Sequence, residues 1–532
     1  MEKQQVISAV QSGETALGIE LGSTRIKAVL IGPNHQPIAT GAHDWENRLE
    51  NGLWTYRLED VWKGIQHAYR QLAETLADSY GASLERLGAL GVSAMMHGYL
   101  PFDAEGRQLC EFRTWRNTVT EEESALLTEQ FQFNIPQRWS IAHLYRAIRK
   151  KEAHVPRLAF LTTLAGYVHW MLTGRKVVGV GEAAGMFPVD SASGTFHEGM
   201  IRQFDEILAS ESLPWRLEDV LPQVLPAGAQ AGTLTSEGAR LLDPTGTLKP
   251  GVPLCPPEGD AGTGMTATNS VAPRTGNVSA GTSIFAMVVL ERPLSRVYPE
   301  LDMVATPTGR PVAMVHCNTC TSDLDAWVQL FAQVLEQAGH VLPKSRLYDM
   351  LYHQALSGAA DCGGVVSYNC YSGEPVIGLS EGRPLLTRQP EAPMSLGNFM
   401  RAQLYAAMAP LKMGMDLLLD QEKAALDRLY GHGGLFKTPN VGQRLMAGAL
   451  NVPVSVMETA GEGGPWGMAI LALYSVRGQG STLEDYLARE VFAQAKGSCV
   501  QPLPEDSAGF QQFLARYKAG LPIERLAAAT QI

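Results

Sequence analysis

Apolar and polar residues alternate along this chain in blocks whose lengths suit strands and helices in turn. Residues 17–31 read LGIELGSTRIKAVLI, which is an apolar run, a Gly-Ser-Thr turn and a second apolar run. Turn-forming residues follow at 32–36, and Pro37–Gly41 begins a third extended run. Leu58–Tyr80 carries apolar residues at helical spacing, and Leu90–Ala94 is expected to be a buried strand. Extended and helical segments in alternation predict an α/β fold.

The hairpin at 17–31 recurs about half a chain later. Gly276–Leu290 reads GNVSAGTSIFAMVVL, again an apolar strand, a small-residue turn and an apolar strand. The two turns align residue by residue: Gly22 with Gly281, Ser23 with Thr282 and Thr24 with Ser283. Two such hairpins, each opening one half of the chain, predict two related domains. Their backbone N–H groups and hydroxyls could hold an anion from both sides.

The second half contains further α/β material and a different C-terminal stretch. Residues 398–420 show the apolar stripe of a buried helix, which Pro410 is expected to kink or split. Beyond about residue 490 the composition becomes mixed, and a helix is expected at 510–519. This last part is interpreted as an accessory segment.

Length and composition restrict the class of protein. The chain has 532 residues, of which 45% are hydrophobic and 18% charged, which supports at least two sizeable cores and excludes extensive disorder. A net charge of −11 is unfavourable for a nucleic-acid partner. The chain has no apolar stretch of the roughly 18–20 residues that span a bilayer and no apolar core of a secretion signal. Seven cysteines do not form a disulfide framework. We expect a cytoplasmic protein without a membrane partner, and the oligomeric state is left open, with a homodimer as one option.

One Cys-x-x-Cys pair lies in the segment His316–Cys320. A structural zinc site needs a second pair of ligands, and Cys362 and Cys370 are not spaced to supply it. A redox motif would need a thioredoxin-like βαβ setting, which the surrounding sequence does not offer. We therefore interpret Cys317 and Cys320 as buried or pocket-side thiols.

Four further segments carry the candidate chemistry. They are GIELGSTRIKAV at 18–29, MHG at 96–98 with TWRN at 114–117, PPEGDAGTG at 256–264, and GHGG at 431–434. In this order and at these separations, the sequence resembles the FGGY carbohydrate kinases over about residues 17–480. The resemblance implies two actin-like (ribonuclease-H-like) domains with a nucleotide cleft between them. It also implies transfer of the γ-phosphate of ATP to a sugar or polyol hydroxyl, with ATP and Mg²⁺ as cofactors.

The resemblance also suggests how the chain is divided. An N-terminal, sugar-binding domain is expected at 1–270, a C-terminal, ATP-binding domain at 271–490, and the accessory segment at 491–532.

Taken alone, Asp260 beside Gly259 and Gly262 is an ordinary turn residue. Phosphoryl transfer needs a carboxylate that orients and deprotonates the attacking hydroxyl, and the aspartate of this Gly-Asp motif has that role in the family.

The nucleotide contacts are expected in three glycine-containing segments. The two turns resemble the phosphate turns of the family: Gly22, Ser23 and Thr24, then Gly281, Thr282 and Ser283. Gly433 and Gly434 resemble its adenosine loop, with His432 interrupting the usual run of glycines. The alternative is that these glycines only tighten two hairpins and one loop.

Glu20 departs from the family pattern. An aspartate usually stands at this position of the first strand and holds the Mg²⁺ complex through water. Glutamate is one methylene longer, so it could reach the metal directly or hold it at a different place. A buried structural carboxylate is the alternative.

The sugar site is expected around the Met-His-Gly motif. Met96 and His97 resemble the xylulose-kinase branch, in which this histidine contacts sugar hydroxyls, and Trp115 fits a tryptophan that lines the same pocket. Arg116 and Asn117 depart from that branch, and Arg116 could bind sugar hydroxyls or pair with a structural carboxylate. A ketopentose such as xylulose or ribulose is predicted, with other ketoses, polyols or signal sugars open. An actin- or Hsp70-like ATPase without a sugar substrate is the alternative from another class.

Overall fold

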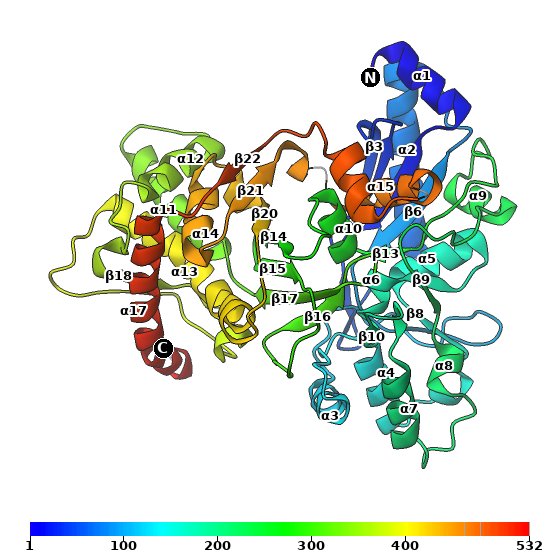
Figure 1. The fold of residues 1–532 in the computed structure, drawn as a ribbon, viewed down its shortest axis with the longest axis horizontal. Helices are drawn as coiled ribbons and strands as arrows, with labels where there is room; N and C mark the ends of the chain where they lie inside the picture. The colour runs from blue at the N-terminus through cyan, green and yellow to red at the C-terminus, as the bar shows by residue number, and fades with distance from the viewer. Residues whose placement is uncertain (462, 479, 531–532) are drawn as a thin grey trace. The chain divides into compact units, whose positions relative to one another are not determined.

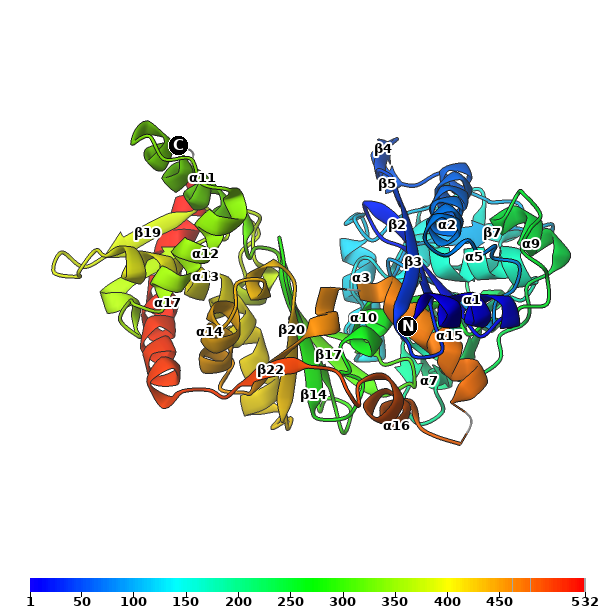
Figure 2. The same cartoon turned by 90° about the horizontal axis from the view of Figure 1, so that it is seen from above.

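The computed structural model describes residues 1–461, 463–478 and 480–530. The chain forms two compact units, each assembled from segments that are distant in sequence (Figures 1 and 2). Unit 1 consists of Met1–Val271, Met303–Val312 and Glu462–Gln494, and unit 2 consists of Ala272–Asp302, Ala313–Gly461 and Ala495–Ile532.

The sheet of unit 1 contains the first predicted hairpin at its centre. Its strands are β1 (Ala16–Leu21), β2 (Arg25–Ile31), β3 (Pro37–Asp44), β6 (Ala89–Ala94) and β13 (Glu258–Gly259). Their order is β13-β6-β1-β2-β3, with β2 antiparallel to both β1 and β3, and β6 parallel to both β1 and β13. The three extended runs and the buried strand predicted from the sequence are therefore confirmed.

Three helices position this sheet and its edge. They are α2 (Leu58–Tyr80), α10 (Asp260–Ala267) and α15 (Gly463–Arg477). The apolar residues predicted for α2 are its buried face, and the helix packs against β2 and β3. Helix α15 packs against β1, β6 and α10, and Figure 1 shows it among elements from the start of the chain. A Cβ on Gly18 would lie 2.1 Å from the Pro465 carbonyl oxygen, so this close approach requires glycine.

The other elements of unit 1 surround this core. Its further helices are α1 (Lys3–Ser12), α3 (Glu121–Phe131), α4 (Ser140–Arg149), α5 (Leu164–Thr173), α6 (Val180–Ala183), α7 (Glu198–Ile207), α8 (Leu217–Val220), α9 (Ser236–Leu242) and α16 (Leu483–Tyr486). Its further strands are β4 (Arg48–Glu50), β5 (Leu53–Thr55), β7 (Leu100–Phe102), β8 (Phe160–Thr162), β9 (Val177–Gly179), β10 (Val189–Asp190), β11 (Thr195–Phe196) and β12 (Gln223–Leu225).

The sheet of unit 2 repeats the strand order of unit 1. Its central strands are β14 (Thr275–Ala280), β15 (Ile284–Val289), β17 (Pro311–Cys317), β20 (Arg428–His432) and β21 (Val454–Met457). The order β17-β15-β14-β20-β21 matches β3-β2-β1-β6-β13, and β14 is antiparallel to β15 and parallel to β20, as β1 is to β2 and β6. The recurrence predicted from the two hairpins is thus a repeat of topology. Strands β16 (Asp302–Ala305) and β22 (Gly497–Val500) extend the ends of this sheet.

The helices of unit 2 differ from the sequence prediction at two places. They are α11 (Ser322–Gln337), α12 (Lys344–Ala355), α13 (Leu396–Asp416), α14 (Val441–Leu450) and α17 (Pro504–Ala529), with strands β18 (Val365–Tyr368) and β19 (Leu385–Arg388) beside them. Helix α13 continues through Pro410 and is not split, because packing over nearly its whole length holds it. Helix α17 is much longer than the predicted 510–519. Among the described residues, no helix is long and apolar enough to cross a bilayer.

The packing units do not follow the contiguous domains expected from the sequence. The segment 462–494, assigned there to the C-terminal domain, belongs to unit 1 through the contacts of α15. Helix α17, assigned to an accessory segment, packs against α14, α13 and β18 and is part of unit 2. The reason is physical, since the apolar face of a strand is covered by whichever helix reaches it, regardless of order along the chain.

Candidate functional site

Three predicted site segments of unit 1 meet at one edge of its sheet. The parallel strands end in register, with Leu21 opposite Ala94 and Ala94 opposite Gly259. The residues that follow these ends are Gly22 of the first turn, the Met-His-Gly motif and Asp260. Ligands of α/β folds bind at this carboxyl edge of parallel strands. The structure therefore brings the first turn, the Met-His-Gly motif and the Gly-Asp motif together.

Asp260 is the first residue of α10 and is exposed on its open side. Dense protein on its other sides raises the pKa of its carboxyl to about 6, while hydrogen bonds from the backbone N–H groups of Met96 and Ala261 act in the opposite direction. At neutral pH the carboxylate is mainly ionised and still basic enough to accept a proton. This is the balance that a general base requires.

Glu20 lies on β1 and is electrostatically coupled to Asp260. Burial, followed by the charge of Asp260, raises the pKa of Glu20 to about 7, and Lys27 acts against this shift. The two carboxyls are hard oxygen donors of the kind that Mg²⁺ uses together with water and phosphate oxygens. Within the part of the chain that the structure describes, no group of three or more His, Cys, Asp or Glu side chains could hold a metal by itself. The residues present fit a magnesium ion that arrives with a nucleotide.

His97 is held as a neutral imidazole at the same edge. Its backbone is left-handed, with φ 69°, and the side chain is only 6% exposed. Burial, followed by the charge of Arg138, lowers the pKa of His97 well below its usual value. Nδ1 lies 3.2 Å from the Gly185 carbonyl oxygen, which can only accept, so Nδ1 carries the proton. The Nε2 atom is thus left as an acceptor.

Met96 serves the site mainly through its backbone. Its side chain is buried, at 5% exposed, and a Cβ on Gly259 would lie 2.3 Å from its Cγ. Its N–H bonds the Asp260 carboxyl. Gly259 therefore allows the strand that precedes Asp260 to lie directly against Met96.

The loop with Trp115 and Arg116 begins beside the Met-His-Gly motif. Backbone hydrogen bonds of 2.9 and 3.1 Å join Tyr99 to Arg113. Trp115 is 39% exposed, and the Arg116 guanidinium lies over the Trp54 ring, 3.8 Å from its centroid. The structure thus gives Arg116 an aromatic partner on β4–β5, and places both residues of the loop at the protein surface.

Two buried glutamates of this region were not predicted. The Glu258 carboxylate accepts hydrogen bonds from the N–H groups of Gly181, at 3.3 Å, and Glu182, at 3.1 Å, and burial raises its pKa to about 8. The Glu182 side chain is fully buried, and neither of its oxygens has a hydrogen bond of ordinary geometry with the described residues. Burial, and then the charges of Glu258 and Asp260, raise the pKa of Glu182 well above its usual value, against the effect of the Thr163 hydroxyl.

The sequence around these two glutamates carries a feature that could have predicted their burial. The two glutamates stand in the runs GVGEAAG and PPEGDAG, where glycine and alanine leave room for a carboxyl. A Cβ on Gly179 would lie 2.2 Å from Glu258 Oε1, and one on Gly181 would lie 2.4 Å from its Oε2. A glutamate flanked by several small residues therefore marks a carboxyl packed against backbone.

In unit 2 the second turn and the glycine loop lie side by side. Strands β14 and β20 are parallel, with Ser279 opposite His432. Gly433, at φ 98°, follows directly, and a Cβ there would lie 2.5 Å from the Ala280 carbonyl oxygen. Thr282 and Gly433 are both exposed. Two predicted nucleotide segments that are 150 residues apart in sequence are thus neighbours at one sheet edge.

The two turns differ in length by one residue. In the first hairpin Leu21 pairs with Ile26, which leaves four residues between them, and in the second Ala280 pairs with Ile284, which leaves three. The turns are therefore equivalent in topology, but Arg25 has no counterpart in the second.

Comparison with known families decides the class of protein. The model of the N-terminal domain of the FGGY family of carbohydrate kinases matches residues 15–265, and that of the C-terminal domain matches residues 276–476. The chain belongs to the FGGY family of carbohydrate kinases. It is therefore a phosphotransferase that uses ATP, and a sugar-type alcohol is the acceptor.

Individual relatives agree on the fold of this FGGY kinase. It is 20% identical over 514 residues to the xylulose kinase of Haemophilus influenzae, covering 94% of this chain and 98% of the relative. The crystal structure of xylulose kinase from Rhodospirillum rubrum matches with a TM-score of 0.77 at 19% identity, covering 96% of this chain and 99% of that one. The structure of gluconate kinase from Lactobacillus acidophilus matches with a TM-score of 0.78 at 15% identity, covering 96% and 98%. The neighbours carry the names of different substrates.

Proposed function

We propose that this kinase phosphorylates a hydroxyl of a ketopentose, xylulose or ribulose, with Asp260 as the catalytic base. The observation that carries the proposal is the setting of Asp260. Asp260 is the first residue of α10, at the carboxyl edge of the sheet. Its carboxylate accepts hydrogen bonds from the backbone N–H groups of Met96 and Ala261, and its pKa is raised to about 6. A base with a pKa near the working pH can orient the sugar hydroxyl and take its proton as the phosphoryl group transfers.

The two turns would hold the phosphates of ATP. In unit 1 the turn Gly22–Thr24, and in unit 2 the turn Gly281–Ser283, offer backbone N–H groups and hydroxyls as donors to phosphate oxygens. Gly433 and Gly434 of unit 2, exposed beside the second turn, would contact the adenosine.

Glu20 and Asp260 would hold Mg²⁺ bound with the nucleotide. The metal would supply positive charge to the phosphate oxygens. Glu20 has a pKa of about 7, so near neutral pH it can lose its proton when a cation arrives, and this favours it as the residue that responds to metal.

The sugar would lie against the Met-His-Gly motif. His97 offers Nε2 as an acceptor for a hydroxyl, while Trp115 and Arg116 supply an exposed aromatic ring and guanidinium donors from the neighbouring loop. The ketopentose is favoured by the similarity of this motif to xylulose kinases and by the name of the relative from Haemophilus influenzae.

The test is ADP release over a panel of xylulose, ribulose, hexuloses, polyols and gluconate, each with the wild type, Asp260→Asn and Asp78→Asn. Asp78 is an exposed aspartate on α2 and serves as the matched control. We expect release that depends on a ketopentose, is lost in D260N and is retained in D78N, while D260N still binds ADP. Release without any sugar would refute the sugar assignment, and an active D260N would refute the base.

A further inference from the structure

Two aromatic residues donate hydrogen bonds to all three backbone carbonyls of the turn Gly22–Thr24. Trp45 Nε1 donates to the Gly22 oxygen at 2.7 Å, and the Trp45 backbone N–H donates to the Thr24 oxygen at 3.1 Å. The Tyr56 hydroxyl donates to the Ser23 oxygen at 2.6 Å. Each peptide plane of the turn is therefore fixed on its carbonyl side.

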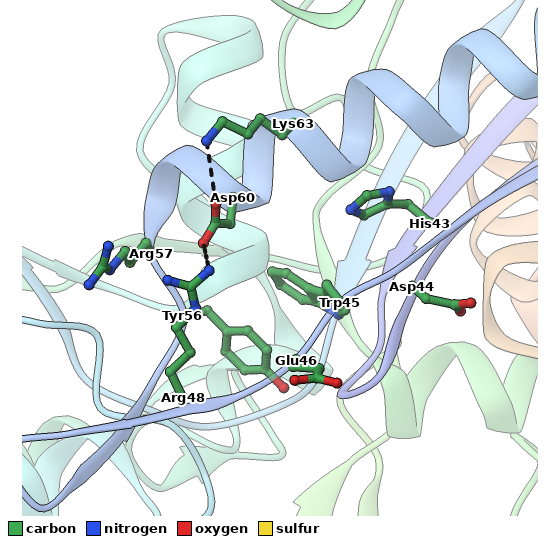
Figure 3. Close-up of a pocket in the computed structure, with 9 residues that line it drawn as sticks. All are labelled: His43, Asp44, Trp45, Glu46, Arg48, Tyr56, Arg57, Asp60 and Lys63. Carbon is green, nitrogen blue, oxygen red and sulfur yellow. Dashed lines mark ion pairs between the residues drawn. The ribbon is translucent and has the colours of Figure 1, made fainter.

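Trp45 and Tyr56, here called the aromatic pair, form one rigid block. Their rings are stacked with centroids 4.2 Å apart, and Trp45 and Tyr56 are 7% and 2% exposed. Figure 3 shows the two rings side by side on the wall of a cavity of about 320 Å³. Burial raises the pKa of Tyr56 to about 12, so its hydroxyl keeps the proton that it donates to Ser23.

Tyr56 is itself anchored by its neighbours in the chain. It follows β5, and the Asn117 side chain bonds Trp54 in β5 twice, from Nδ2 to the Trp54 oxygen and from the Trp54 N–H to Oδ1, both at 2.8 Å. The Thr114 N–H also donates to the Trp54 oxygen, at 3.1 Å. The phenol is thus held by a strand that is bonded to the loop of Trp115.

Unit 2 holds its turn in the equivalent way. The Gly281 oxygen accepts from the Thr321 N–H at 3.1 Å and from its hydroxyl at 2.7 Å. The Thr282 oxygen accepts from the Cys320 N–H at 2.9 Å and from the Ser322 hydroxyl at 3.2 Å. In both units, carbonyls of the turn are bound by residues just after the third strand of the repeated topology, Trp45 after β3 and Cys320–Ser322 after β17; Tyr56, after β5, is an addition of unit 1.

Fixing the carbonyls also fixes the opposite side of each peptide. Because the peptide group is planar and trans, an N–H points away from the carbonyl of the same unit. The Gly22 N–H closes the hairpin by donating to the Arg25 oxygen at 3.0 Å. The peptides fixed at the Gly22 and Ser23 carbonyls therefore present the N–H groups of Ser23 and Thr24 outward without reorganisation. Donors oriented in advance bind an anion better than donors that must be ordered on binding.

We propose that Trp45 and Tyr56 are positioning residues for phosphoryl transfer, holding the first turn so that its N–H groups face the phosphates of the nucleotide. The proposal rests on the proposed function of this turn. It adds two residues outside the turn, neither of which needs to touch the nucleotide.

The test compares Tyr56→Phe with Tyr474→Phe. The Tyr474 hydroxyl also donates to a backbone carbonyl of unit 1, that of Ser481 at 2.9 Å, so each variant loses one tyrosine–carbonyl hydrogen bond. Affinity for an unreactive ATP analogue is measured by calorimetry, KM for ATP and for the sugar by ADP release, and thermal stability by melting. We expect Y56F to weaken analogue binding and raise KM for ATP roughly 3- to 10-fold, the effect of one hydrogen bond, with KM for the sugar unchanged and a melting temperature like that of Y474F.

A second variant tests the positioning role independently if Y56F lowers the stability of the protein. Trp45→Phe retains an aromatic ring and the backbone bond to Thr24 but removes the indole donor to Gly22, so it should give the same selective loss for ATP. If the wild type itself does not bind the analogue, the proposed function fails. If the wild type binds it and both variants bind as Y474F does, the positioning role alone is wrong.

Discussion

Replacing Gly464 with alanine would test the role of Glu20 without substituting Glu20 itself. Gly464 is the second residue of α15, and a Cβ there would lie 1.5 Å from Glu20 Oε2 and 2.7 Å from its Cδ. Non-bonded atoms settle about 3.5 Å apart, so the carboxyl must withdraw by about 2 Å. The end of the flexible Glu20 side chain can make this move without any shift of the β1 backbone.

The expected result is a large loss of activity with little loss of stability. Displacing a group that holds the reacting phosphate by about 1 Å or more costs on the order of 10²-fold in rate. We therefore expect kcat/KM of G464A to fall about 100-fold, with more Mg²⁺ needed for half-maximal rate. Its melting temperature should stay within a few degrees of the wild type.

Gly264→Ala is the matched control for this experiment. Gly264 lies inside α10, and a Cβ there meets nothing within 4 Å, so alanine should stabilise the helix by roughly 0.5–1 kcal/mol and leave the rate unchanged. ADP release at a series of Mg²⁺ concentrations, with thermal unfolding of each variant, separates the cases. Wild-type rate and magnesium dependence in G464A would contradict a functional role of Glu20.

Three further predictions concern pH and the glycine loop. Burial raises the pKa of Asp260 to about 6, so kcat/KM for the sugar should fall about tenfold per pH unit below that value, and a limb near pH 4 would be inconsistent with Asp260 as the base. The folded state raises the pKa of Glu182, so the wild type should lose stability as the pH rises above the usual glutamate range. Glu182→Gln lacks this loss, so its melting temperature relative to the wild type should increase from pH 5 to pH 8; a constant difference would argue against a protonated Glu182. Gly433→Ala should weaken ADP binding about tenfold through strain at φ 98° and contact with Ala280, whereas Gly264→Ala, whose Cβ meets nothing within 4 Å, should bind normally; equal dissociation constants would exclude the loop from the site.

Local patterns predicted the local structure well. The hairpin around Gly22, the helix Leu58–Tyr80 and the strand before Met95 follow from periodicity over a few residues, and the structure contains all three. The likeness between the two Gly-Ser/Thr turns also predicted the repeat, because a turn and its flanking strands carry their signal within about fifteen residues. The Gly-Asp motif led to Asp260 by family resemblance, and the structure gives that residue a setting suited to a base.

The features that the sequence did not predict depend on contacts between distant segments. The burial of Glu258 depends on backbone that approaches it at Gly179 and Gly181, and Glu182 lies against Gly259. The bond from Tyr56 to Ser23 spans 33 residues. No periodicity contains such information, because each partner alone looks like an ordinary polar or aromatic residue.

The return of α15 to unit 1 has a consequence for biosynthesis. During translation, β1 leaves the ribosome among the first residues, but the helix that packs on Gly18 is made only after most of unit 2. The nascent N-terminal half must therefore wait with part of its apolar sheet uncovered until Gly463–Arg477 emerges. Maturation of the two halves is linked for this reason, and a ribosome that stalls before this helix would release a fragment that chaperones and proteases can recognise.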